Sequence, residues 1–151
     1  MTTNNIVYVT RQFNCSINTL FKWIVEPSLI SKWFGPKHLS IGNVQSDFKI
    51  GGHYEIELLK PDANCFFIGG IYLEIDEPNH IKFSFVYNGL DKVPPESTVQ
   101  ISLKEISPFY TELTLIQKFE TVPSDMESRT KAWGNMFQKL TDGIKTVTND
   151  A

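Results

Sequence analysis

The sequence predicts an α+β fold: a curved antiparallel sheet of about six or seven strands wrapped around a long C-terminal helix, with two short helices after the first strand. Two patterns carry this prediction. Alternating apolar and polar residues recur through the middle of the chain, which indicates strands with one buried face. Towards the C-terminus, apolar residues recur every three or four positions, as in an amphipathic helix. These two apolar surfaces are expected to bury each other.

The N-terminal part predicts one strand and two short helices. The segment at about 5–13 alternates as a strand does. The segment at about 16–24 has helical apolar spacing, and Ser16 is placed to cap its first turn. A second short helix is expected to begin at Pro27 and to end before Gly35, because proline favours the first helical turn and glycine favours the end of a helix.

Six strand-like segments follow, at about 41–48, 52–60, 65–76, 80–87, 97–106 and 111–119. The joins between them are rich in Pro, Asp, Asn and Ser, which are typical turn residues. The segment at about 125–147 predicts the long helix. Its apolar stripe includes Trp133, Phe137, Leu140 and Ile144.

Two glycine pairs interrupt the strand pattern. Gly51 and Gly52 lie between two strands, whereas a phosphate-binding loop leads into a helix, so this pair predicts a hairpin turn with positive φ. Gly69 and Gly70 lie inside a strand, where glycine marks a bulge or a strong bend. Such a bend would help the sheet to curl around the helix.

Composition argues against several classes of protein. The chain has 151 residues, which suits one domain over 1–151. Its formal net charge is -3, and its only arginines are Arg11 and Arg129. Nucleic-acid binders usually carry clustered positive charge, so no nucleic-acid partner is expected. The longest mostly apolar run, at 65–75, is short and interrupted, so no membrane partner is expected either.

The N-terminus and the cysteines point to the cytoplasm. The first residues lack a basic segment followed by an apolar one, so no secretory signal peptide is expected. Cys15 and Cys65 lie far apart in the sequence, and a chain of this size does not need a disulfide, so two reduced thiols are predicted.

Several short motifs in a fixed order carry a family resemblance over about residues 6–147. They are Trp33 with Gly35 and Pro36, Asp47 with Gly51 and Gly52, Gly70 with Glu74, Ile75 and Pro78, and Trp133 with Leu140. In these motifs the chain resembles the activator of heat-shock ATPase homologue (AHSA) family of the START-like, or SRPBCC, ligand-binding superfamily. One departure is Ala132, where members of the family often carry glycine.

The resemblance implies a helix-grip fold with a cavity between sheet and helix, but it implies no particular reaction. The expected function is therefore binding of an apolar or amphipathic small molecule in that cavity. A co-chaperone-like module that binds a chaperone through its outer surface is one alternative. A cyclase- or hydrolase-type enzyme that uses the same cavity is another. The sequence leaves open whether the protein is a monomer or a homodimer.

Eleven residues are predicted to line the ligand site: Trp33, Phe34, Tyr54, Ile56, Tyr72, Phe83, Phe85, Tyr87, Arg129, Trp133 and Phe137. Tyrosine hydroxyls would orient a ligand inside an apolar space, and Arg129 would receive a ligand carboxylate. The alternative for each aromatic ring is a place in the ordinary core. The alternative for Arg129 is a side chain that extends to the surface.

No catalytic residue, cofactor or metal site is predicted. The histidines, His38, His53 and His80, show no metal-ligand spacing, and only His38 is placed near a cavity mouth. Glu55 and Glu57 share one strand face, but this face is opposite the apolar one, so both are expected to face water.

Overall fold

A computed structural model describes residues 5–62 and 64–149 and confirms the predicted order of elements. The elements are β1 (Ile6–Phe13), α1 (Ile17–Val25), α2 (Pro27–Trp33), β2 (Ser40–Ser46), β3 (His53–Leu59), β4 (Cys65–Asp76), β5 (His80–Asn88), β6 (Ser97–Ser107), β7 (Tyr110–Phe119) and α3 (Met126–Asn149).

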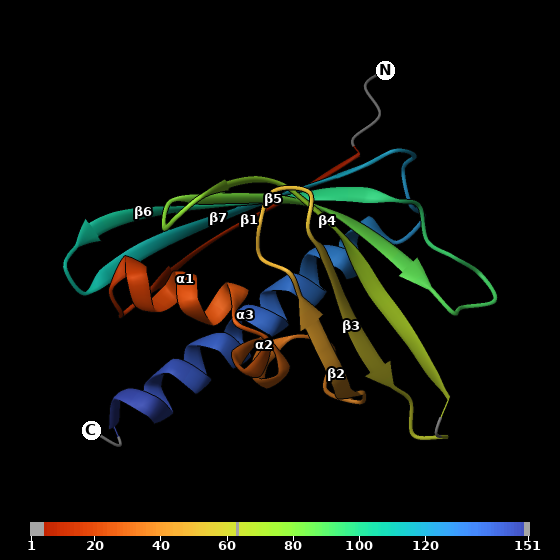
Figure 1. Cartoon of the computed structure of the whole chain (residues 1–151), viewed down its shortest axis with the longest axis horizontal. Coiled ribbons are helices and arrows are strands. Elements are labelled where there is room, and N and C mark those ends of the chain that lie inside the picture. Colours follow the sequence, from red (N-terminus) through yellow and green to blue (C-terminus); the bar gives the residue numbers. More distant parts are fainter. Residues whose placement is uncertain (1–4, 63, 150–151) are drawn as a thin grey trace.

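The strands form a seven-stranded antiparallel sheet in the order β1-β7-β6-β5-β4-β3-β2. Figure 1 shows the sheet curling over α3, with β1 and β5 to β7 on one side of the bend and β2 to β4 on the other. The two short helices lie beside α3 under the same concave face. The predicted curved sheet around a long C-terminal helix is therefore confirmed.

Local hydrogen bonds explain how the two short helices begin and how they are joined. The Ser16 side chain accepts a hydrogen bond from the backbone N–H of Thr19 at 3.2 Å and so caps α1. Helix α2 begins at Pro27. The indole N–H of Trp33 donates to the carbonyl of Trp23 at 2.9 Å, which fixes the end of α2 against α1.

The first glycine pair forms the predicted turn. Gly51 has a φ of 83°, a backbone conformation that favours glycine, and its N–H donates to the carbonyl of Tyr72. At Gly52 a Cβ atom would overlap the carbonyl oxygen of Asp47. The two glycines therefore allow the chain to turn between β2 and β3 and to pack closely against β4.

The second glycine pair allows a close crossing of strands, and the expected bulge lies elsewhere. Gly70 pairs with Tyr54 across β3 and β4, and a Cβ atom on Gly70 would overlap the carbonyl oxygen of Ser84 in β5. The register shift between β4 and β5 falls between Tyr72 and Glu74, not at the glycines. Of the two alternatives predicted for Gly69 and Gly70, the bulge was wrong by a few residues, because these glycines accommodate neighbouring backbone, while the register leaves the strong bend as a prediction.

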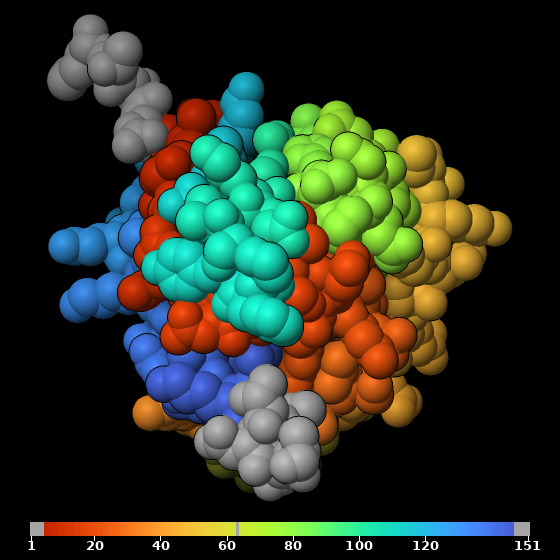
Figure 2. Space-filling view, turned by 90° about the vertical axis from the view of Figure 1, so that its left-hand side faces the viewer, coloured from red at the N-terminus to blue at the C-terminus, as the bar shows by residue number. Residues whose placement is uncertain are grey.

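The core joins α3 to the concave face of the sheet and to the short helices. The ring centroid of Phe137 lies 6.2 Å from those of Phe13 and Trp33 and 5.8 Å from that of Trp133. At the end of the molecule seen in Figure 2, the β6–β7 turn lies beside the N-terminal elements. There the Thr111 hydroxyl donates to the Cys15 carbonyl at 2.9 Å.

Candidate functional site

Two neighbouring cavities lie on the concave face of the sheet, the inner one mainly beneath α1 and α2 and the outer one beside α3. The inner cavity measures about 40 Å³ and the outer cavity about 620 Å³. The outer volume falls within the range of small-molecule sites, whereas the inner volume is close to that of a single water molecule. The body of a small molecule would therefore fit only in the outer cavity.

Three aromatic side chains, Phe34, Phe85 and Trp133, line both cavities. Their rings contact one another, with centroids 6.3 Å apart for Phe34 with Phe85, 6.3 Å for Phe34 with Trp133 and 5.9 Å for Phe85 with Trp133. All three are buried. They form an aromatic wall between the inner and the outer space, and we call them the aromatic wall below.

The structure divides the predicted site residues between the two cavities and the core. Five of them line only the inner cavity: Trp33, Tyr54, Ile56, Tyr72 and Phe83. Tyr87 and Arg129 line only the outer one. Phe137 lines neither cavity among the described residues and packs in the core, which was its alternative.

Several residues of the outer cavity were not predicted. Those on strands and α3 include Leu58, Phe66, Ile68, Gln117, Met136 and Lys139, and those in the α2–β2 connection include Lys37. The sequence offered a signal for Leu58, which alternates with the predicted Tyr54 and Ile56. In the structure Phe66 lies opposite Leu58 and Ile68 lies opposite Ile56. Residues directly opposite in an antiparallel pair share one face of the sheet.

The tyrosines of the inner cavity already have hydrogen-bond partners. The Tyr54 hydroxyl donates to the carbonyl of Ser84 at 2.7 Å, and the Tyr72 hydroxyl lies 2.7 Å from the Ser46 hydroxyl. Burial raises the pKa of both phenols. Both hydroxyls therefore stay neutral in the ordinary pH range and tie strands together.

We expect Tyr54→Phe to leave ligand affinity unchanged within about twofold, because the Tyr54 hydroxyl is occupied by Ser84. Loss of this hydrogen bond should lower the free energy of unfolding by about 1 kcal/mol. Titration with the neutral fluorescent probe N-phenyl-1-naphthylamine and urea unfolding measure the two quantities. A loss of affinity of about tenfold with an unchanged stability would show that the hydroxyl contacts the ligand instead.

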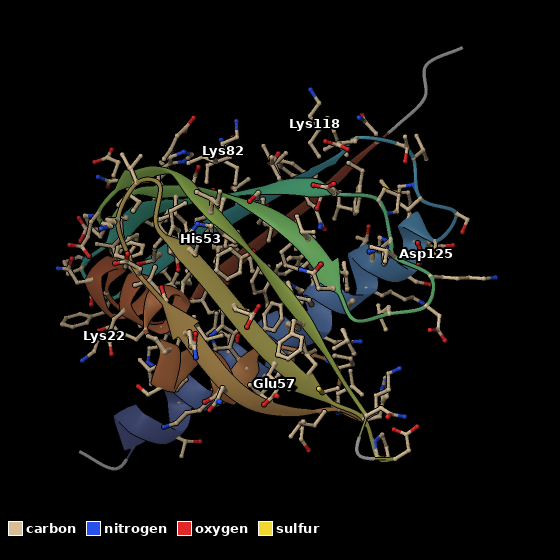
Figure 3. The ribbon with its side chains drawn as sticks, turned by 45° about the vertical axis from the view of Figure 1, so that its right-hand side comes forward. Lys22, His53, Glu57, Lys82, Lys118 and Asp125 are labelled. Atoms are coloured by element: carbon tan, nitrogen blue, oxygen red, sulfur yellow. The ribbon has the colours of Figure 1, made fainter. Side chains whose placement is uncertain are left out.

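Arg129 lies at one end of the outer cavity with its charge already paired. Its Nε atom donates to the Asp125 carboxylate at 2.8 Å, and its guanidinium carbon lies 5.1 Å from the ring centroid of Phe119 and 6.0 Å from that of Tyr87. Only 15% of the side chain is exposed. Figure 3 shows Asp125 at the start of α3. A ligand carboxylate here would compete with that of Asp125.

Two hydrogen bonds through a buried glutamine hold Trp133 of the aromatic wall. The indole N–H of Trp133 donates to Oε1 of Gln117 at 2.8 Å, and Nε2 of Gln117 donates to the Ser97 hydroxyl at 2.9 Å. Gln117 is only 2% exposed. The sequence held a signal for it, because Gln117 occupies an apolar position in the alternation of Leu113, Leu115 and Phe119.

The histidines and the paired glutamates lie mostly away from the cavities. His38 lines the outer cavity, whereas the ring nitrogens of His80 lie 2.8 Å from the Glu74 carboxylate and 3.1 Å from the Ser102 hydroxyl. Glu55 is exposed, and Glu57, labelled in Figure 3, accepts a backbone N–H at 3.2 Å. Within residues 5–62 and 64–149, no three His, Cys, Asp or Glu side chains gather to hold a metal ion.

Comparison with known proteins identifies similar sequences and folds. The family profile described as Activator of Hsp90 ATPase homolog 1-like protein matches residues 14–145. No curated protein matches the chain. In the part of the chain that the structure describes, no helix has the length and apolar character needed to cross a membrane.

Solved structures share the fold at low sequence identity. Protein NE0264 from Nitrosomonas europaea is 24% identical with a TM-score of 0.79, over 93% of this chain and 94% of that one. Protein CV1439 from Chromobacterium violaceum is 20% identical with a TM-score of 0.80, over 92% and 96%. The AHSA1 protein SPO3351 from Silicibacter pomeroyi is 19% identical with a TM-score of 0.77, over 93% and 98%.

Proposed function

The chain belongs to the Activator of Hsp90 ATPase homolog 1-like family, and from this premise we propose that it binds an apolar or amphipathic small molecule in its outer cavity. The family supports a ligand-binding fold in general terms. The observation that carries the proposal is a cavity of about 620 Å³ bordered by the aromatic wall and by the apolar side chains of Leu58, Phe66 and Ile68.

Burial of apolar surface supplies the driving force for such binding. Removal of roughly 200 Å² of apolar ligand surface from water contributes about 5 kcal/mol before the costs of ordering the ligand are subtracted, at about 25 cal/mol per Å². Aromatic rings offer this contact area at little cost in conformational entropy. Polar groups at the rim would then orient the ligand.

Catalysis in the same cavity and binding of a chaperone remain alternative predictions. Two titratable groups of the outer cavity have shifted pKa values, and such groups are common in enzymes. Burial is the first cause of both shifts, raising the pKa of Tyr87 and lowering that of Lys139. Each group also has a partner, Arg129 for Tyr87 and the Gly35 carbonyl for Lys139. These features support a binding site more directly than a reaction.

We expect Ala132→Trp to weaken binding of N-phenyl-1-naphthylamine by at least about tenfold, because Ala132 lines the outer cavity and an indole there fills ligand space. Stability should change by less than about 0.5 kcal/mol, because Ala132 is exposed on α3. Fluorescence titration measures the affinity, and native mass spectrometry of the purified parent protein detects any molecule that it already carries.

Gln138→Trp is the matched control, because Gln138 is exposed on α3 and does not line the outer cavity. It should retain the parental affinity. Equal affinities in the two variants, or no saturable binding in the parent protein, would remove the proposal. A chaperone that binds the outer surface should be retained by both variants, which separates that alternative from cavity binding.

A further inference from the structure

Two lysines lie together at the end of the outer cavity where α2 leads into β2. Lys37 and Lys139 both line the cavity, one from the connection and one from α3. Hydrogen bonds between the backbone of Gly35 and two side chains of α3 hold the connection against this helix. The Gly35 carbonyl accepts from Nζ of Lys139 at 2.7 Å, and the Gly35 N–H donates to the sulfur of Met136 at 3.1 Å. This attachment keeps the two lysines close to each other.

The positive charge of this lysine pair has no acidic counterpart in the described structure. The residues that line the outer cavity include Lys37, His38, Arg129, Lys131 and Lys139 and no Asp or Glu among those described. None of the ion pairs within residues 5–62 and 64–149 involves Lys37 or Lys139. Burial and the nearby charge of Lys37 lower the pKa of Lys139, as expected for a cation that lacks a negative partner.

Arg129 differs from the lysine pair in this respect. It lies ten residues before Lys139 on α3, a separation of about 15 Å along the helix axis. Its charge is matched by Asp125. Lys131 also lines the cavity outside the ion pairs described, eight residues before Lys139 and so about 12 Å from it along the helix axis. Lys37 and Lys139 form the pair of neighbouring cations without an acidic partner, and the apolar surface of the aromatic wall begins at Phe34, next to Gly35.

We propose that the ligand is an amphipathic acid whose anionic head group binds Lys37 and Lys139 while its apolar body lies against the aromatic wall. This inference rests on the proposed function and adds the chemical class of the ligand. A carboxylate between two ammonium groups gains charge-assisted hydrogen bonds. Lys139 is half-buried, so water screens its charge less, whereas Lys37 is exposed and contributes a more strongly screened charge.

The test compares decanoate with decan-1-ol, which share the apolar chain and differ in charge. Decanoate is used below its micelle concentration and decan-1-ol below its solubility limit to displace N-phenyl-1-naphthylamine, and decanoate binding is also measured directly by calorimetry. In the parent protein, decanoate should bind at least about tenfold more tightly than decan-1-ol. In the Lys37→Gln/Lys139→Gln double variant, this preference should fall below about threefold, with affinity for decan-1-ol unchanged.

Two further variants locate the anion. Lys118→Gln removes a charge from the outer face of the sheet, where Figure 3 shows Lys118 pointing away from α3, and should keep the full preference. Arg129→Gln should keep it as well. A preference that survives in the double lysine variant, or that is lost in Arg129→Gln instead, would overturn the inference.

The assay also separates this inference from the proposed function. Equal displacement by decanoate and decan-1-ol in the parent protein would overturn the anionic head group but leave cavity binding intact. Absence of binding by the neutral probe, by decan-1-ol and by decanoate in calorimetry would overturn both.

Discussion

Gly70→Ala should lower the free energy of unfolding by about 3 kcal/mol or more, a large effect for the addition of one methyl group. A Cβ atom at this position would overlap the backbone carbonyl of Ser84, which cannot rotate away as a flexible side chain can. The same carbonyl accepts the hydroxyl of Tyr54, which reaches across Gly70 from the neighbouring strand. The variant must therefore move β4 away from β5 and break this hydrogen bond.

Gly134→Ala is the matched control, because it makes the same chemical change in α3. Its added Cβ would lie 3.0 Å from a terminal nitrogen of Arg11, the flexible end of a side chain. Alanine is favoured over glycine inside a helix by about 1 kcal/mol, so this variant should equal or exceed the parent in stability. Urea unfolding of the three proteins gives the comparison. Similar stabilities for Gly70→Ala and the parent would show that β4 and β5 can separate at no cost.

The elements of this fold could be predicted because each has a local cause. Period-two alternation, a capping serine and Pro27 at the first turn of α2 all act within a few residues, and the structure confirms the elements they predict. The position of the β4–β5 register shift has no such local cause. The shift falls between Tyr72 and Glu74, where the partner in β5 changes from Phe83 to Lys82, and no turn residue or change of alternation marks this point in the sequence.

The candidate site could be predicted only in part for the same reason. Strand parity places Tyr54, Ile56 and Phe85 on the inner face of the sheet, but the residues that border empty space depend on where α3 lies over that face. Lys139 meets the α2–β2 connection only in three dimensions, through the carbonyl of Gly35. The partner of Arg129 was within reach of the sequence, because Asp125 lies four residues earlier on the same helix face.

Gln117→Leu should lower the free energy of unfolding by about 2–4 kcal/mol, although leucine has a similar size and suits a buried strand position. Gln117 accepts the indole N–H of Trp133 and donates to the hydroxyl of Ser97, and both partners are buried. Leucine would leave the indole N–H of Trp133 unsatisfied, at a cost of about 1–3 kcal/mol. It would also remove one of the two hydrogen bonds of Ser97, worth about 1 kcal/mol, while the Ser97 hydroxyl still donates to the carbonyl of Phe85 at 3.5 Å. Release of Trp133 should also loosen the aromatic wall and weaken probe binding.

Gln100→Leu is the control for this prediction, because Gln100 is half-buried on the opposite face of the sheet and its loss should change stability by less than about 0.5 kcal/mol. The indole N–H signals in a ¹H–¹⁵N spectrum provide a second measurement, in which the Trp133 signal should shift while that of Trp33, bound to the carbonyl of Trp23, stays in place. A loss below about 1 kcal/mol with a shifted Trp133 signal would mean that water from the outer cavity replaces the amide. That outcome would show that water can enter the buried end of the cavity once Gln117 is replaced. The role of Gln117 would then be to keep solvent away from the aromatic wall, and not to hold Trp133 in place.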